Sequence, residues 1–170
     1  YNPNGDFIIN NTIVDKSNKN IRHLLQNAVL CNDSEINHNG EKWSVSGSST
    51  EGAIVVAAAK AGLPYKELRK EFSRIDVMPF ESEKQFMATL NANGTDRFNI
   101  IKGAPEVNGG VCQFSGENPN VDKHIVDAEV EKMAGEGMRV LAVARKNINN
   151  GAEQLTPDML QSGFSFIGLI

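Results

Sequence analysis

The chain has few of the features that mark several large classes of protein. Its 170 residues include only two cysteines, which lie far apart and form no CxxC pair, so reduced thiols are favoured over a disulfide framework. The three histidines show no spacing typical of metal ligands, and we expect no metal site. No apolar run is long enough to cross a bilayer, and no signal peptide is visible.

A surplus of basic charge is also missing. The sequence contains 17 lysines and arginines against 21 aspartates and glutamates, which gives a net charge of -4 at pH 7. This balance offers no basic surface for nucleic acid and no polybasic patch for a membrane. The hydrophobic content of 40% and the charged content of 22% are typical of a soluble globular protein. We therefore predict one domain, residues 1–170, without a nucleic-acid partner or direct membrane contact.

Hydrophobic periodicity predicts helices and strands in separate groups. Helical spacing predicts helices over residues 19–31, 50–61, 64–72 and 121–133, with a further short one opening at 156–157. Alternating or continuous apolar patterns predict strands near 7–9, 12–14, 75–80, 86–90, 98–101, 139–144 and 164–170, with a hairpin turn at 91–94. Residues 32–49 are predicted to be a loop, with room for a short hairpin near Trp43. Ser49 or Thr50 is the expected N-cap of the second helix. Because the strands gather in hairpins, the predicted fold class is α+β.

The most informative stretch is Lys102-Gly103-Ala104-Pro105-Glu106, which directly follows the apolar strand pattern. A lysine at the end of a strand, followed by a glycine, places a cation beside backbone that a ligand can approach closely. Pro105 and Glu106 then favour the start of a helix. By themselves, these residues indicate a phosphate or a nucleotide near Lys102.

This pentapeptide resembles the KGAPE signature in the nucleotide-binding domain of P-type cation-transporting ATPases. Four further segments resemble that family in its own order, namely residues 49–53 (STEGA), 78–84 with Met87 (MPFESEK), 137–144 (GMRVLAVA) and 166–169 (FIGL). Together they run from about residue 47 to the C-terminus. The resemblance implies a twisted antiparallel β-sheet flanked by helical hairpins, and a domain that binds ATP. The variants at residues 80–85 (FESEKQ) and 87–90 (MATL) are most similar to calcium-pump-like bacterial members, and a pump for sodium or another cation remains open.

Two residues are assigned to the adenine ring. Spacing alone favours a core position for Phe80, where most strand phenylalanines lie. However, Pro79 before it and the polar residues 81–84 after it predict an exposed strand end, where an aromatic ring can stack on a purine. In the family, the corresponding phenylalanine stacks on adenine. Glu51 is either a first-turn helix glutamate favoured by the dipole or, as the resemblance implies, a carboxylate that accepts from the adenine amino group. Such a carboxylate would favour adenine over guanine.

A second group of residues is assigned to the phosphates. Lys102 is either a solvated strand-end lysine or a cation near the adenine and the phosphates, beside the N–H groups of Gly103 and Ala104. Gly103 is either an ordinary turn glycine or a residue that keeps the backbone close to the ligand. Arg139 is either a surface ion pair, which contributes little to stability, or, by resemblance, a guanidinium that contacts the phosphates.

The resemblance also has departures. Ser82 and Leu141 match the family at its nucleotide site. At residue 85, where family members often have lysine, this chain has Gln85. Ser49 replaces the usual proline. Gly109 and Gly110 follow the KGAPE segment and are expected to weaken a helix there by about 1 kcal/mol each relative to alanine.

The motifs for phosphoryl transfer are absent from the sequence. It contains neither the acceptor segment Asp-Lys-Thr-Gly-Thr nor the actuator loop Thr-Gly-Glu-Ser. The resemblance therefore implies a monomeric domain excised from a larger pump of the plasma membrane, exposed to the cytoplasm and without catalytic residues. Its expected partners are ATP or ADP and the phosphorylation and actuator domains of the same parent chain. Mg²⁺ would accompany the nucleotide and be held mainly outside this domain.

Two other functions remain open. One is a stand-alone regulatory module that binds nucleotide or protein without catalysis. The other is a small soluble phosphotransferase, which requires a poised nucleophile and a Walker or kinase phosphate loop. Neither feature occurs in the sequence.

Overall fold

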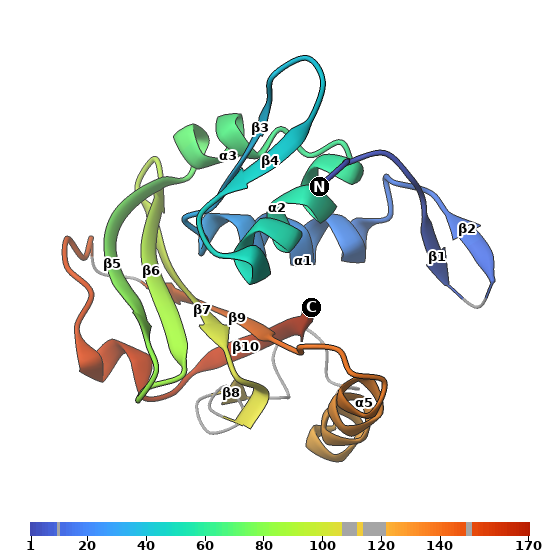
Figure 1. The fold of residues 1–170 in the computed structure, drawn as a ribbon. Helices are drawn as coiled ribbons and strands as arrows, with labels where there is room; N and C mark the ends of the chain where they lie inside the picture. Colours follow the sequence, from blue (N-terminus) through green and yellow to red (C-terminus); the bar gives the residue numbers. More distant parts are fainter. Residues whose placement is uncertain (10, 107–111, 114–121, 149–150) are drawn as a thin grey trace. The chain divides into compact units, whose positions relative to one another are not determined.

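The computed structural model describes residues 1–170 except 10, 107–111, 114–121 and 149–150 (Figure 1). Its described part contains helices and strands in separate groups, which confirms the predicted α+β class. The chain divides into two compact units, Tyr1–Glu71 and Phe72–Ile170. That all 170 residues form one nucleotide-binding domain stays a prediction.

Three helices form the centre of the first unit. They are α1 (Lys19–Leu30), α2 (Ser49–Lys60) and α3 (Tyr65–Glu71), and they contact one another. The N-cap of α2 is Ser48, whose hydroxyl accepts the N–H of Glu51 at 3.2 Å. The prediction that Ser49 or Thr50 caps this helix is therefore wrong. Ser48 is the residue with extended backbone angles, and Ser49 and Thr50 already lie inside the helix.

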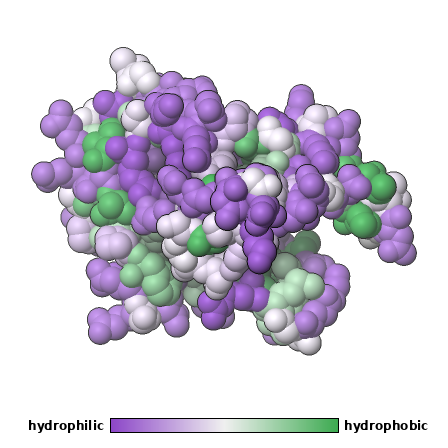
Figure 2. Space-filling model, turned by 45° about the horizontal axis from the view of Figure 1, so that its top comes forward, coloured by the Kyte–Doolittle hydropathy of each residue, from purple (hydrophilic) through white to green (hydrophobic). Residues whose placement is uncertain are grey.

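Two β-hairpins complete this unit. β3 (Glu35–His38) pairs antiparallel with β4 (Trp43–Ser46), which confirms the hairpin expected near Trp43. β1 (Phe7–Ile9) pairs with β2 (Thr12–Val14), as predicted. The β1–β2 hairpin carries three isoleucines that are at least half exposed, namely Ile8 at 66%, Ile9 at 50% and Ile13 at 67%. Figure 2 shows apolar surface at the position of this hairpin, on a face that is mostly hydrophilic elsewhere.

The second unit is built on a six-stranded sheet with the order β5-β6-β7-β9-β10-β8. Its strands are β5 (Ser73–Glu81), β6 (Phe86–Asn93), β7 (Asp96–Gly103), β9 (Ala142–Ile148), β10 (Phe164–Leu169) and β8 (Cys112–Gln113). Neighbouring strands are antiparallel except for β8, which is parallel to β10. The predicted antiparallel sheet is thus confirmed for five strands, and β5 and β6 are visibly twisted in Figure 1.

One core cluster of this unit lies on one face of the sheet. Ala88, Ile101 and Ala144 are neighbours across β6, β7 and β9, and they pack with Phe164 of β10. Leu160 covers them from the short 3₁₀ helix η1 (Pro157–Leu160). The strand predicted over 139–144 is central, as expected, but it begins only at Ala142.

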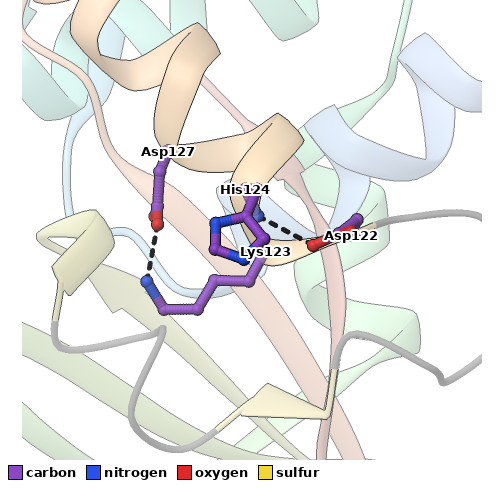
Figure 3. Close-up of polar contacts among 4 residues, drawn as sticks. All are labelled: Asp122, Lys123, His124 and Asp127. Carbon is purple, nitrogen blue, oxygen red and sulfur yellow. Dashed lines mark hydrogen bonds and ion pairs between the residues drawn. The ribbon is translucent and has the colours of Figure 1, made fainter.

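The helix α5 (Lys123–Gly135) begins two residues later than predicted, because Asp122 caps it. The Asp122 carboxylate accepts the N–H of His124 at 2.9 Å (Figure 3). Lys123 Nζ lies 2.7 Å from the carboxylate of Asp127, which is one helical turn further along α5. The two side chains form an exposed ion pair between residues i and i+4. Among the described residues, no helix is long and apolar enough to cross a membrane.

Asp76 links β5 to the segment before η1. Leu155 N–H donates to its Oδ2 at 2.7 Å and Val77 N–H donates to its Oδ1 at 2.8 Å. These hydrogen bonds, the one from Leu155 most of all, lower the pKa of Asp76 below its ordinary value of 3.8. The ionised carboxylate therefore stabilises the fold at and above about pH 4, and this stabilisation is lost as the pH falls through the lowered pKa.

Replacing Asp76 by asparagine is expected to lower the free energy of unfolding by about 1 kcal/mol at pH 7, since charge-assisted acceptors are lost. The difference from the parent chain should shrink as the pH falls below about 4, where the aspartate of the unfolded chain becomes protonated first, and should keep shrinking as the pH falls through the lowered pKa of Asp76 in the folded protein. Urea unfolding at pH 7 and pH 3 measures both values. A difference that is the same at the two pH values would contradict this role for the ionised carboxylate.

Candidate functional site

In the first unit, the candidate residue is Glu51, which lies in the first turn of α2 as predicted. Its side chain is half-buried, and its backbone carbonyl accepts a hydrogen bond from Asn32 Nδ2 at 3.0 Å. The next residue, Gly52, has no room for a Cβ, which would overlap with the side chain of Val45 in β4. Strand β4 therefore packs directly against the turn that carries Glu51.

In the second unit, Phe80 lies near the end of β5, an edge strand of the sheet. Its side chain is 59% exposed, whereas Phe98 in β7 is 1% exposed. The register of β5 against β6 shifts between Met78 and Glu81, so the regular pairing is interrupted at Phe80. The structure confirms the exposed strand end and excludes the core position for Phe80. Its contact with adenine stays a prediction.

Gln85 lies in the turn between β5 and β6, and its backbone is hydrogen-bonded to the KGAPE segment. Gln85 has a left-handed backbone with φ of 58°, and its N–H donates to the Glu81 carbonyl at 2.7 Å. Its own carbonyl accepts the N–H of Ala104 at 2.9 Å. Ser82 is an exposed residue of the same turn. The structure therefore brings Gln85, Gly103 and Ala104 together, and one of the two N–H groups assigned to a ligand is used within the chain.

Gly103 has a steric role that the sequence interpretation missed. A Cβ on this residue would overlap with the carbonyl oxygen of Gln85 and with Cα and Cβ of Phe86. The interpretation of Gly103 as a residue that keeps the backbone near a ligand is thus not needed to explain the glycine. Close approach of the β5–β6 turn to β7 explains it within the protein.

Lys102 is buried, with only 4% of its surface exposed. The prediction of a solvated lysine at the strand end is therefore wrong. Strand β7 continues to Gly103, so Lys102 lies inside the sheet, directly between Met87 of β6 and Val143 of β9. These two neighbours are also buried, at 2% and 0% exposure.

Arg139 and Leu141 precede β9 rather than open it. Arg139 is exposed in the irregular segment after α5, so its predicted place at a strand start is wrong. Leu141 pairs with Ile170 through two backbone hydrogen bonds of 2.8 Å. The register of β7 against β9 places Gly103 opposite Ala142, the residue that follows Leu141. Leu141 is therefore one residue away from the partner of Gly103 in the KGAPE segment.

Further expectations concern the residues that follow Ala104 and the absence of a metal site. Pro105 and Glu106 are helical, as the sequence predicted, whereas Gly109 and Gly110 lie outside the described residues. Within the described residues, no group of three or more His, Cys, Asp or Glu side chains could hold a metal ion.

A comparison with known families shows to which family the chain belongs. The family described as "P-type ATPase, cytoplasmic domain N" matches residues 20–170, which is most of the chain. The chain belongs to this family. The N-domain match spans both compact units, and the five segments that indicated the family all lie within it.

Relatives of this N domain occur in bacteria. "Cation-transporting ATPase pma1" of Synechocystis sp. is 34% identical over 99% of the chain and 20% of that protein. "Calcium-transporting ATPase" of Bacillus subtilis is 29% identical over 98% of the chain and 20% of that protein. "Probable cation-transporting ATPase F" of Mycobacterium tuberculosis is 34% identical over 84% of the chain and 16% of that protein. The chain thus spans about a fifth or less of these relatives' lengths.

Proposed function

We propose that this N domain binds ATP through its adenine and presents the γ-phosphate to the phosphorylation domain of a P-type cation pump. The observation that carries the proposal is the exposed Phe80 at the end of β5. The turn that follows β5 is hydrogen-bonded to the KGAPE segment, and the chain belongs to the N-domain family. The names of its relatives support an ATP-driven cation transporter as the parent protein. Several relatives are named for calcium, and we propose Ca²⁺ as the transported ion.

Each site residue has a proposed task. The Phe80 ring stacks on adenine, because an exposed aromatic face is a suitable platform for a base. The Glu51 carboxylate accepts from the adenine amino group, and Arg139 offers an exposed guanidinium to the phosphates. Lys102 supplies a positive charge from inside the sheet. Because Lys102 is buried, its charge is less screened by water than that of a surface lysine.

The remaining positions of the proposed site shape the surface around these groups. Ser82 and Gln85 belong to the β5–β6 turn, and Leu141 lies next to the residue paired with Gly103. Gln85 is uncharged, so this turn adds no positive charge at that position for the phosphates. Mg²⁺ would accompany the nucleotide, and we place its ligands mainly on the phosphorylation domain of the parent protein, which would also supply the phosphoryl acceptor.

The isolated chain is expected to bind ATP with a free energy of only about -4 to -5 kcal/mol, in the millimolar to sub-millimolar range. The reason is that one stacking ring and few charges contact the ligand. ADP and AMP should bind about as well as ATP, since most contacts are to the adenosine part. NMR titration or calorimetry with each nucleotide measures this. Nanomolar affinity, or binding that requires the γ-phosphate, would contradict the adenine-centred site.

A further inference from the structure

Side chains hold both backbone polar groups of Glu51. The Ser48 hydroxyl accepts its N–H at 3.2 Å, and Asn32 Nδ2 donates to its carbonyl at 3.0 Å. The N–H of a first-turn residue needs an acceptor outside the helix, but its carbonyl can accept within the helix. Capping therefore does not require the contact from Asn32, which reaches Glu51 from 19 residues away.

Asn32 is itself held in place. It is 1% exposed, and its Oδ1 accepts the N–H of Ser34 at 2.8 Å. Its carbonyl accepts from the guanidinium of Arg69 at 2.7 Å. Arg69 also donates to the carbonyls of Ser34 at 3.2 Å and Val29 at 3.1 Å, and it lies 5.3 Å from the centre of the Tyr65 ring. One guanidinium from α3 thus binds three carbonyls of the segment that carries Asn32.

A second contact joins the same segment to the start of α2. Ser34 Oγ donates to the carbonyl of Ser48 at 3.3 Å, and Ser48 is the residue that caps Glu51. Gly47 lies so close that a Cβ on it would overlap with Ser34 Oγ. The position of the Glu51 backbone is therefore set by Asn32 on its carbonyl side and, through Ser48, by Ser34 on its N–H side.

We propose that Asn32 is a positioning residue, which places the Glu51 carboxylate and thereby sets the preference of the domain for adenine over guanine nucleotides. The proposal rests on the role proposed above for Glu51. A carboxylate that accepts from the amino group of adenine finds a carbonyl at the same position of guanine, so its exact position governs the discrimination. Asn32 acts on this position through the backbone of α2 and does not itself contact the nucleotide.

The test compares ATP and GTP affinities of Asn32→Asp, measured by NMR titration. The substitution keeps the size of the side chain but replaces the donor Nδ2 with an acceptor facing the Glu51 carbonyl. We expect the ratio of ATP affinity to GTP affinity to fall about fivefold, the factor that corresponds to one net hydrogen bond. The ratio cancels the effect of an added negative charge, which acts on both triphosphates. In a Glu51→Ala background, Asn32→Asp should not change the ratio further.

Asn27→Asp is the matched control. Asn27 is also 1% exposed, but its Nδ2 donates to the carbonyl of His23 within α1. This variant should lower the Tm, as any added buried acid does, and leave the ATP-to-GTP ratio unchanged. The control therefore separates a loss of stability in the first unit from a loss of positioning at Glu51.

The outcomes distinguish this proposal from the proposed function. An ATP-to-GTP ratio that Glu51→Ala leaves unchanged would remove the adenine role of Glu51 and the proposal with it. A ratio that falls in Glu51→Ala but not in Asn32→Asp, or that falls equally when Asn32→Asp is added to Glu51→Ala, would overturn only the positioning role. If Asn32→Asp does not fold, Asn32→Ala provides the same comparison. Failure of both to fold would show that Asn32 is purely structural and overturn the proposal.

Discussion

Replacing Phe80 by alanine is expected to remove most ATP binding and to leave the stability of the domain nearly unchanged. The Phe80 ring is 59% exposed, so its removal leaves no cavity in the core. The loss of a stacking face should weaken binding by about 1–3 kcal/mol, which is roughly a fivefold to 150-fold loss of affinity. A thermal melt and an NMR titration with ATP measure the two properties on the same sample.

Phe98→Ala is the control for this result. Phe98 is 1% exposed, its ring centre lies 6.0 Å from that of Phe72, and the guanidinium of Arg145 lies 3.8 Å from it. Its replacement should lower the free energy of unfolding by about 3–5 kcal/mol, as expected for a buried phenylalanine. If Phe80→Ala unfolds the domain instead, or binds ATP with unchanged affinity, the adenine platform is wrong.

Lys102 cannot serve as a second surface variant beside Phe80. As a rim residue, it would be expected to tolerate alanine without loss of stability. Since it is 4% exposed and lies between buried neighbours in β6 and β9, Lys102→Ala should lower both the stability and the ATP affinity. A loss of binding in that variant is therefore interpretable only together with its unfolding free energy.

Gly103→Ala is expected to lower the free energy of unfolding by roughly 2–3 kcal/mol, near the upper end of the cost of overpacking. The new methyl group would overlap with the backbone of Gln85 and Phe86, which cannot move aside as a flexible side chain can. Relief requires the β5–β6 turn to shift, which breaks the 2.9 Å hydrogen bond from Ala104 to Gln85. ATP affinity should fall as well, because Ser82 and Gln85 of the proposed site belong to this turn.

Gly135→Ala is the matched control for Gly103. Gly135 lies at the end of α5 and has no positive φ, and a methyl group added there would meet no neighbouring group within 4 Å. Alanine there should be neutral or stabilise the fold by about 0.4–1 kcal/mol. Chemical denaturation of both variants measures the two values. Equal stability of Gly103→Ala and the parent chain would show that the turn is not closely packed on β7.

Much of the fold was predictable because it depends on local patterns. The α+β class, the helix at 19–30, the hairpins of both units and the central position of β9 follow from hydrophobic period and turn residues. Several errors lie at element ends, and the two-residue strand β8 was not predicted. Ser48 rather than Ser49 or Thr50 caps α2, and β9 begins at Ala142 rather than at Arg139. Caps and strand ends depend on backbone angles and on pairing with distant strands, which periodicity does not reveal.

For the site, five short segments in a constant order were enough to indicate the family, and the polar residues around Phe80 were enough to predict the exposed end of β5. Only the tertiary structure showed that Lys102 is buried, that Gly103 makes room for the Gln85 carbonyl, and that Asn32 holds Glu51. The physical reason is the same in each case. Burial, steric overlap and long-range hydrogen bonds join residues that are far apart in the chain, whereas the identity of a motif and the polarity of its neighbours are local properties of the sequence.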